Sequence, residues 1–89
     1  MLFNQIKITD VKLQLGILIR NLRKQANISQ DELANELDLS RITIQNIESG
    51  KNFTIDTLLK ALQYFEMINP LYEKIIEQIK ETDNPDPLY

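Results

Sequence analysis

The six residues at positions 41–46, RITIQN, carry polar side chains where a purely structural helix would carry Glu and Lys. Arg can bond to guanine, Asn and Gln can bond to adenine, and Thr or an aliphatic chain can contact the methyl group of thymine. All of these types occur here within two helical turns. The candidate base-reading residues are Arg41, Ile42, Thr43, Gln45 and Asn46.

Catalytic chemistry has little support, because the chain contains neither Cys nor His. This removes the usual zinc ligands, the Cys and Ser–His nucleophile pairs and the commonest general base. Carboxylates are abundant, but they form no recognisable acid–base pair. We therefore expect no enzyme, no metal site and no cofactor.

Two short helical patterns must position the polar segment. Ser29 and Glu32 have the spacing of a capping box that begins the first of them. Residues 38–39 form the turn, Ser40 can cap the second helix, and Gly50 suits the left-handed conformation that ends it. The inward-facing positions are Leu33, Ala34, Leu37, Ile44 and Ile47.

Two short helices joined by a three- or four-residue turn form a helix-turn-helix unit. The short spacer forces the helices to cross steeply. The first helix can then lie across a phosphate backbone while the second enters a major groove. We predict that the helix at 40–48 enters the groove.

A helix is also expected before this unit, with Asp10 as its N-cap and Asn27 at its end. Gly16 inside it costs roughly 1 kcal/mol relative to Ala. It either permits two helices to approach closely or is a tolerated defect. The apolar stripe of this helix is Leu15, Leu18, Ile19, Leu22 and Ala26.

Two helices are expected after the unit. The fourth begins at Thr54 or Asp56, and the fifth follows an Asn69 cap with Pro70 in its first turn and runs to about residue 81. Their apolar stripes are Leu58, Leu59, Leu62 and Phe65 in the fourth, and Leu71, Tyr72, Ile75, Ile76 and Ile79 in the fifth.

The predicted fold class is all-α, a compact bundle of four to five helices. We expect an N-terminal arm at 1–9 that can include a short β-strand, a domain at 10–81 and an irregular tail at 82–89. The longest apolar run, LGILI at 15–19, is far too short to span a bilayer. We expect a soluble, cytoplasmic protein with no membrane partner.

Net charge is −3, which argues against strong non-specific affinity for DNA. The charge is unevenly distributed. Residues 1–28 carry five basic and one acidic side chain, whereas residues 54–89 carry three basic and seven acidic ones. An acidic total can therefore coexist with one basic face.

The stretches IRNLRKQ, SQDELA, LSRITIQNIESGK and TLLKAL resemble the lambda-repressor-like helix-turn-helix family, also called the XRE family. The resemblance covers about Leu15 to Met67. It implies a bundle of four or five helices that binds a double-stranded DNA operator, usually as a homodimer. An apolar residue at position 42, where many members place a polar one, departs from the pattern, as does the acidic net charge.

The resemblance also assigns roles to individual residues. Arg41, Ile42 and Asn46 occupy the usual base-reading positions, although Ile42 could simply pack. Arg23 and Glu48 match a pair that ties the first helix to the third; otherwise they would form an ordinary surface ion pair. Residues expected at the DNA backbone are Gln30, Ser40, Lys51 and Asn52.

Several functions fit this interpretation. The first is a sequence-specific regulator, a dimeric repressor of its own operon. A partial resemblance to HipB-like antitoxins, through QIKITD, SQDELA and TLLKALQYF, suggests a protein that also neutralises a kinase-type toxin. The third is a helix-turn-helix protein that has lost DNA binding and pairs only with proteins.

Overall fold

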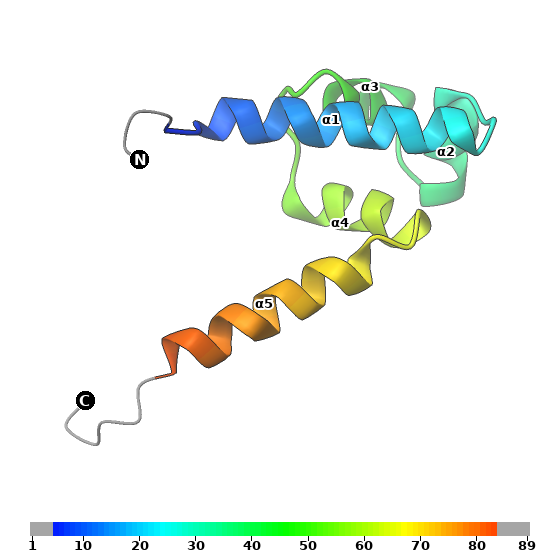
Figure 1. Ribbon diagram of the computed structural model, residues 1–89. Helices are drawn as coiled ribbons and strands as arrows, with labels where there is room; N and C mark the ends of the chain where they lie inside the picture. The colour runs from blue at the N-terminus through cyan, green and yellow to red at the C-terminus, as the bar shows by residue number, and fades with distance from the viewer. Residues whose placement is uncertain (1–4, 84–89) are drawn as a thin grey trace.

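A computed structural model describes residues 5–83 as five α-helices in chain order. α1 lies across α2 and α3, α4 packs beneath them, and α5 projects away from α4 (Figure 1). No strand occurs between residues 5 and 83, so the all-α prediction is confirmed. The helices span Ile8–Gln25 (α1), Gln30–Leu37 (α2), Arg41–Glu48 (α3), Ile55–Tyr64 (α4) and Ile68–Thr82 (α5).

The start of α1 differs from the prediction. The N-cap is Lys7, and Asp10 lies in the first turn, where its carboxylate accepts a hydrogen bond from the Lys7 N–H at 2.9 Å. The carboxylate satisfies the backbone from inside the helix, which lets the helix begin earlier. The predicted strand is wrong at residues 5–8, because 5–7 have no regular structure and Ile8 is helical. The rest of that strand lies outside the described residues.

Both helices of the central unit begin as predicted. The Ser29 hydroxyl accepts the Glu32 N–H at 3.0 Å, and the Glu32 carboxylate accepts the Ser29 N–H at 2.7 Å. The Ser40 hydroxyl accepts the Thr43 N–H at 3.1 Å and so caps α3. Asp38, with φ of 56°, makes the turn between them. Gly50, with φ of 74°, follows α3 in the left-handed region, as predicted.

α1 and α3 approach each other closely at Gly16, between α1 and α3. A Cβ atom at this position would lie 2.5 Å from the Ile47 carbonyl oxygen and 2.6 Å from that of Glu48. Only a residue without a Cβ fits here. Of the two interpretations of Gly16, the close approach is correct.

The hydrophobic core lies among the first four helices. Ile19 of α1, Leu33 of α2, and Ile44 and Ile47 of α3 are completely buried, and Ala61 and Leu62 close the core from α4. α5 contributes no buried residue. The core therefore fixes α3 against α1, α2 and α4 without α5.

The last two helices follow the prediction in part. Thr54 caps α4 through its hydroxyl, which accepts the Thr57 N–H at 3.2 Å. α5 begins at Ile68 after Met67, so Asn69 is not its cap and lies in the first turn with Pro70. Met67 and Ile68 pack against the core, and this packing sets the start of the helix. Residues 84–89 of the predicted tail lie outside the described residues.

No helix within residues 5–83 is both long enough and apolar enough to cross a membrane.

Candidate nucleic-acid interface

The outward face of α3 carries four of the five predicted base-reading side chains. At 100° per residue, Arg41, Ile42, Gln45 and Asn46 lie within one arc of about 140°. Arg41, Ile42 and Gln45 are exposed and Asn46 is half-buried. Ile44 and Ile47 occupy the opposite side and anchor the helix in the core.

Ile42 and Thr43 differ in how they are placed. Ile42 is 66% exposed, so it does not serve as a packing residue within the chain. Its side chain is free to meet an apolar group such as a thymine methyl. Thr43 lies outside the arc, and its hydroxyl is 2.9 Å from that of Ser40. Thr43 and Ser40 are therefore engaged with each other at the start of the helix, and their predicted DNA contacts would have to share these hydroxyl groups.

A buried ion pair fixes the end of α3. The Arg23 Nε lies 2.6 Å from the Glu48 Oε2, and the Arg23 Nη2 donates to the Glu48 Oε1 at 3.1 Å. Both residues are more than 90% buried. Arg23 also donates to the Ile28 carbonyl oxygen at 2.9 Å. The pair thus joins α1, α3 and the loop before α2, and it is not an ordinary surface ion pair.

Gln30 belongs to the same network. Its Nε2 donates to the Glu48 Oε1 at 3.0 Å. The amide nitrogen must face the carboxylate, since the amide oxygen cannot donate. Any phosphate contact by Gln30 therefore falls to its second amide hydrogen or to its backbone N–H. That N–H lies at the N-terminus of α2, where the helix dipole favours an anion.

An exposed ion pair links α2 with the start of α3. The Arg41 Nε lies 3.7 Å from the Asp31 Oδ1, and the two side chains are 58% and 65% exposed. Exposed pairs of this kind contribute about 0–1 kcal/mol, so Arg41 can leave Asp31 for another acceptor at little cost.

Basic residues of α1 flank α3, and the sequence reasoning missed them. The Lys12 ammonium group donates to the Asn52 Oδ1 at 3.1 Å, which places it beside the loop after α3. Lys51, in the same loop, is exposed. Arg20 lines a polar depression of about 390 Å³ together with Gln45 of α3. No local signal could reveal these neighbours, although the basic character of residues 1–28 hinted at them.

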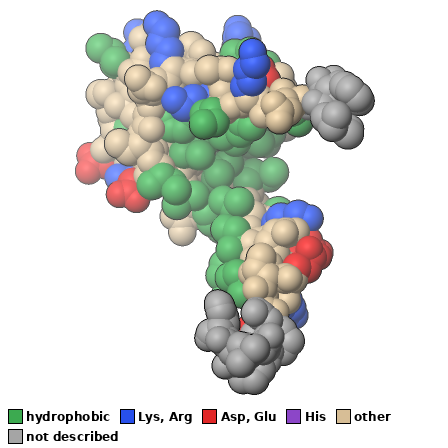
Figure 2. Space-filling view, turned by 90° about the vertical axis from the view of Figure 1, so that its left-hand side faces the viewer, with side chains coloured by type: hydrophobic (Ala, Val, Ile, Leu, Met, Phe, Trp, Pro, Cys, Tyr) green, Lys and Arg blue, Asp and Glu red, His purple; other side chains and the backbone are tan. Residues whose placement is uncertain are grey.

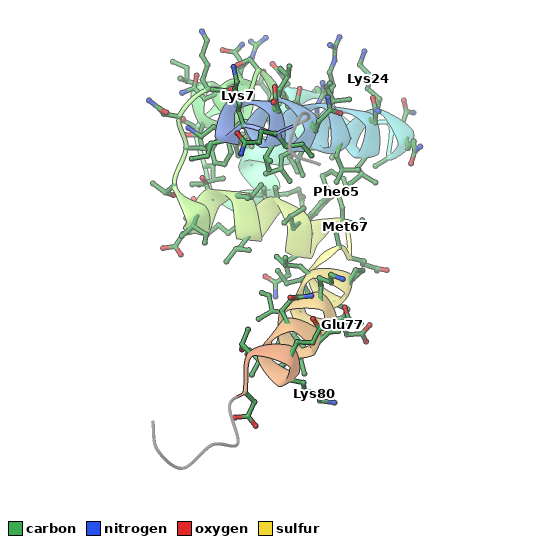
Figure 3. The ribbon with its side chains drawn as sticks, turned by 60° about the vertical axis from the view of Figure 1, so that its left-hand side comes forward. Lys7, Lys24, Phe65, Met67, Glu77 and Lys80 are labelled. Carbon is green, nitrogen blue, oxygen red and sulfur yellow. The ribbon has the colours of Figure 1, made fainter. Side chains whose placement is uncertain are left out.

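Cationic side chains extend along one side of the molecule. Figure 2 shows Lys and Arg atoms gathered over the upper surface, and Figure 3 shows Lys7 and Lys24 projecting from the two ends of α1 on the side opposite α5. An acidic total therefore coexists with a locally basic surface, which is what contact with phosphate requires.

Nothing in residues 5–83 groups three or more Asp or Glu side chains in a way that could hold a metal ion. The buried polar atoms of this part of the chain all have hydrogen-bond partners. The arrangement is thus that of a rigid recognition surface.

Comparison with known proteins places most of the chain. The helix-turn-helix family matches residues 19–72, a segment from the second half of α1 into α5. A protein of Methanocella arvoryzae, provisionally named an HTH-type transcriptional regulatory protein, is 51% identical over 45 residues, which are 51% of this chain and 14% of the relative. A Methanoculleus marisnigri protein with the same name is 38% identical over 60 residues, 67% of this chain and 19% of the relative.

The chain thus spans less than a fifth of the length of these curated relatives. Neither name mentions a toxin or an antitoxin, so the HipB-like alternative stays a prediction. The DNA contacts of individual residues stay predictions as well.

Proposed function

This chain belongs to the XRE-type helix-turn-helix family, and from that premise we propose that it is a sequence-specific DNA-binding transcriptional regulator that represses its own operon as a dimer. The names of the Methanocella and Methanoculleus relatives support transcriptional regulation. The single observation that carries the proposal is the outward face of α3, where Arg41, Ile42, Gln45 and Asn46 share one side of a helix anchored in the core.

Specificity is assigned to this face. In the major groove, Arg41 can bond to guanine, Asn46 and Gln45 can bond to adenine, and Ile42 can contact a thymine methyl. The buried Arg23–Glu48 pair holds α3 against α1, so the readers are presented in one fixed orientation. A rigid support of this kind keeps side chains in register with the base edges.

Affinity is assigned to the groups around α3. The backbone N–H of Gln30 at the start of α2, together with Lys51 and Asn52 after α3, would face the phosphates on either side of the groove. Lys12 lies beside Asn52 and adds a positive charge to the same edge. Each neutralised phosphate releases counterions, so binding should weaken steeply as salt is raised.

Repression follows from occupancy. Two copies would bind half-sites about 34 Å apart, one helical turn of DNA, and block the polymerase. The chain needs no effector domain for this mechanism, because the bound dimer is itself the obstacle.

Fluorescence anisotropy tests the proposal. The purified chain is titrated against the DNA upstream of its own gene and against a scrambled fragment of the same composition, at low and at near-physiological salt. We expect tighter binding to the native fragment at both salts. Equal affinity for the two fragments at both salts would contradict sequence-specific recognition.

Two variants then test the assignment of the readers. Arg41→Ala and Asn46→Ala should each weaken binding to the native fragment by about 5- to 150-fold, the equivalent of about 1–3 kcal/mol per lost base contact. The matched control is Asn69→Ala, since Asn69 is exposed on α5, which projects away from the α1–α4 bundle. If both reader variants kept the native preference, α3 would not be the reading helix.

A further inference from the structure

α5 carries an apolar face that residues 5–83 leave largely exposed. Leu71, Tyr72, Ile75 and Ile79 are 36%, 63%, 48% and 54% exposed, and no residue of the helix is buried. At 100° per residue the four lie on one side of α5, while its charged residues lie on the other. These four side chains are called the α5 ridge below.

The ridge lacks the packing that a helix of this length needs. A 15-residue helix is marginal in water by itself, and most helix stability in proteins comes from packing of an apolar face. α5 leaves the bundle after its contact with α4 (Figure 1). The radius of gyration is 16.2 Å, against about 12 Å for a compact chain of this length. A single copy therefore leaves the outer turns of α5 without support.

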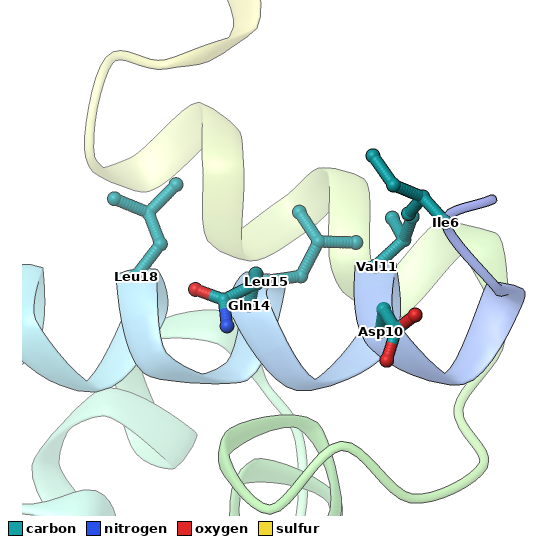
Figure 4. A pocket seen from close by; sticks show the side chains of 6 residues that line it. All are labelled: Ile6, Asp10, Val11, Gln14, Leu15 and Leu18. Atoms are coloured by element: carbon teal, nitrogen blue, oxygen red, sulfur yellow. The ribbon is translucent and has the colours of Figure 1, made fainter. Parts of the chain in front are cut away.

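The same chain carries an apolar groove along the first half of α1. Its volume is about 570 Å³ (Figure 4). Of its polar lining residues, Asp10 already accepts the Lys7 N–H, which leaves Gln14 to meet a ligand. A small-molecule site usually offers several converging polar groups, so this groove suits apolar side chains better. The apolar residues of this α1 groove are Ile6, Val11, Leu15 and Leu18.

Ridge and groove belong to one continuous apolar surface. Figure 2 shows hydrophobic side chains running from beneath α1 across the middle of the molecule and down α5. A smaller apolar notch at the elbow, lined by Leu59 and Ile68 among others, joins the two. Patches of more than a few hundred square ångströms mark interaction sites on soluble proteins.

The exposed area is sufficient for a stable dimer. The exposed fractions of the ridge, Ile6 and Val11 together equal about three fully exposed large side chains. That is on the order of 600 Å², at about 200 Å² for each side chain. A standard interface takes about 800 Å² from each partner, of which a little over half is apolar. One copy therefore supplies the apolar area that such an interface requires.

We propose that the α5 ridge of one copy lies in the α1 groove of a second copy, and that the second ridge lies in the first groove. Two-fold pairing covers both surfaces with a single partner, because each copy contributes a ridge and a groove. The ridge cannot reach its own groove, since Met67 and Ile68 pack against the core and Glu66, with φ of 60°, sets the direction of α5. The inference rests on the dimer of the proposed function and assigns its surfaces.

Sedimentation velocity of the full chain, without DNA, tests the proposal. We expect a particle of twice 10.4 kDa. Ile75→Glu places a charge in the ridge and Val11→Lys places one in the groove, and both should give monomers. Ile42→Glu is the matched control, because Ile42 is exposed on α3 and should leave the dimer intact. Circular dichroism checks that each variant stays helical, which the exposure of these side chains favours.

Mixing the two disrupted variants tests the pairing itself. In a mixed dimer the ridge of the Ile75→Glu variant meets the groove of the Val11→Lys variant, so opposite charges face each other. The second ridge and the second groove are both unaltered. Ile75→Glu mixed with Val11→Lys should therefore form dimers that neither variant forms alone.

The contrary outcomes are distinct. A wild-type monomer over a wide concentration range, or a dimeric Ile75→Glu variant, would overturn the proposal. A Val11→Lys variant that stays dimeric while Ile75→Glu is monomeric would show ridge pairing with ridge, which also overturns it. None of these measurements uses DNA, so failure of DNA recognition would be seen separately in the anisotropy titrations.

Discussion

Replacing Gly16 by Ala tests the packing that positions α3. The added Cβ would lie 2.5 Å from the Ile47 carbonyl oxygen, whereas real Cβ atoms essentially never come within 3.0 Å of another atom in this way. Both neighbouring groups are backbone, at the Ile47 and Glu48 carbonyls, so no side chain can swing aside. α1 and α3 must separate by about 0.5 Å or more in a densely packed interior.

Two effects of opposite sign decide the magnitude. Ala favours the helix by about 1 kcal/mol relative to Gly. Overpacking a well-filled site typically costs about 1–3 kcal/mol, and a clash with backbone belongs at the upper end. We expect a net loss of about 1–2 kcal/mol in the free energy of unfolding. For a domain of this size that lowers Tm by about 4–15 °C.

Thermal melting followed by circular dichroism measures the change. The matched control is Asn21→Ala, an exposed position of α1 where the gain in helix propensity meets no obstacle and Tm should rise slightly. DNA affinity should fall for Gly16→Ala, because α3 is displaced, and should hold for the control. A Gly16→Ala variant at least as stable as the wild type would refute the close approach of α1 and α3.

Three further predictions concern ion pairs and caps. Glu48→Gln leaves the buried Arg23 guanidinium without its counter-charge and should cost about 3–5 kcal/mol in urea unfolding, whereas replacing both residues by apolar ones of similar volume should cost much less; equal losses would contradict the pair's role. Ser29→Ala removes the cap of α2 and should cost about 0.5–2 kcal/mol by the same measurement, with no effect expected if the capping bond is absent in solution. Asp31→Asn removes a negative charge beside Arg41, so binding to scrambled DNA should tighten at low salt and the difference should vanish at high salt; unchanged anisotropy titrations would show that Asp31 does not influence DNA binding.

Helix starts show how far local sequence signals reach. The Ser29–Glu32 box and the Ser40 cap were predicted correctly, because each involves residues three apart that bond to each other. Asp10 and Asn69 were assigned as caps on the same logic, but both lie inside the first turn. Their helices begin where the backbone N–H groups find partners and where apolar residues reach the core, and the second condition is not local.

The candidate site was likewise predicted in part. Four of the five proposed readers share the outward face of α3, because the helical period alone separates them from Ile44 and Ile47. Thr43 falls outside that arc and bonds to Ser40. Lys12 escaped notice because it meets Asn52 across 40 positions in the sequence.

By itself, then, the sequence determined the helices, the short turn between α2 and α3, and the face of α3 that is free to read bases. These features depend on interactions between residues at most four apart, so pattern and capping chemistry are enough to specify them. Only the tertiary structure decided that Gly16 admits α3, that Arg23 and Glu48 are buried together, and that α5 leaves the bundle with its apolar face uncovered. Each of these depends on how close distant segments come, and that distance is set by the packing of the whole core.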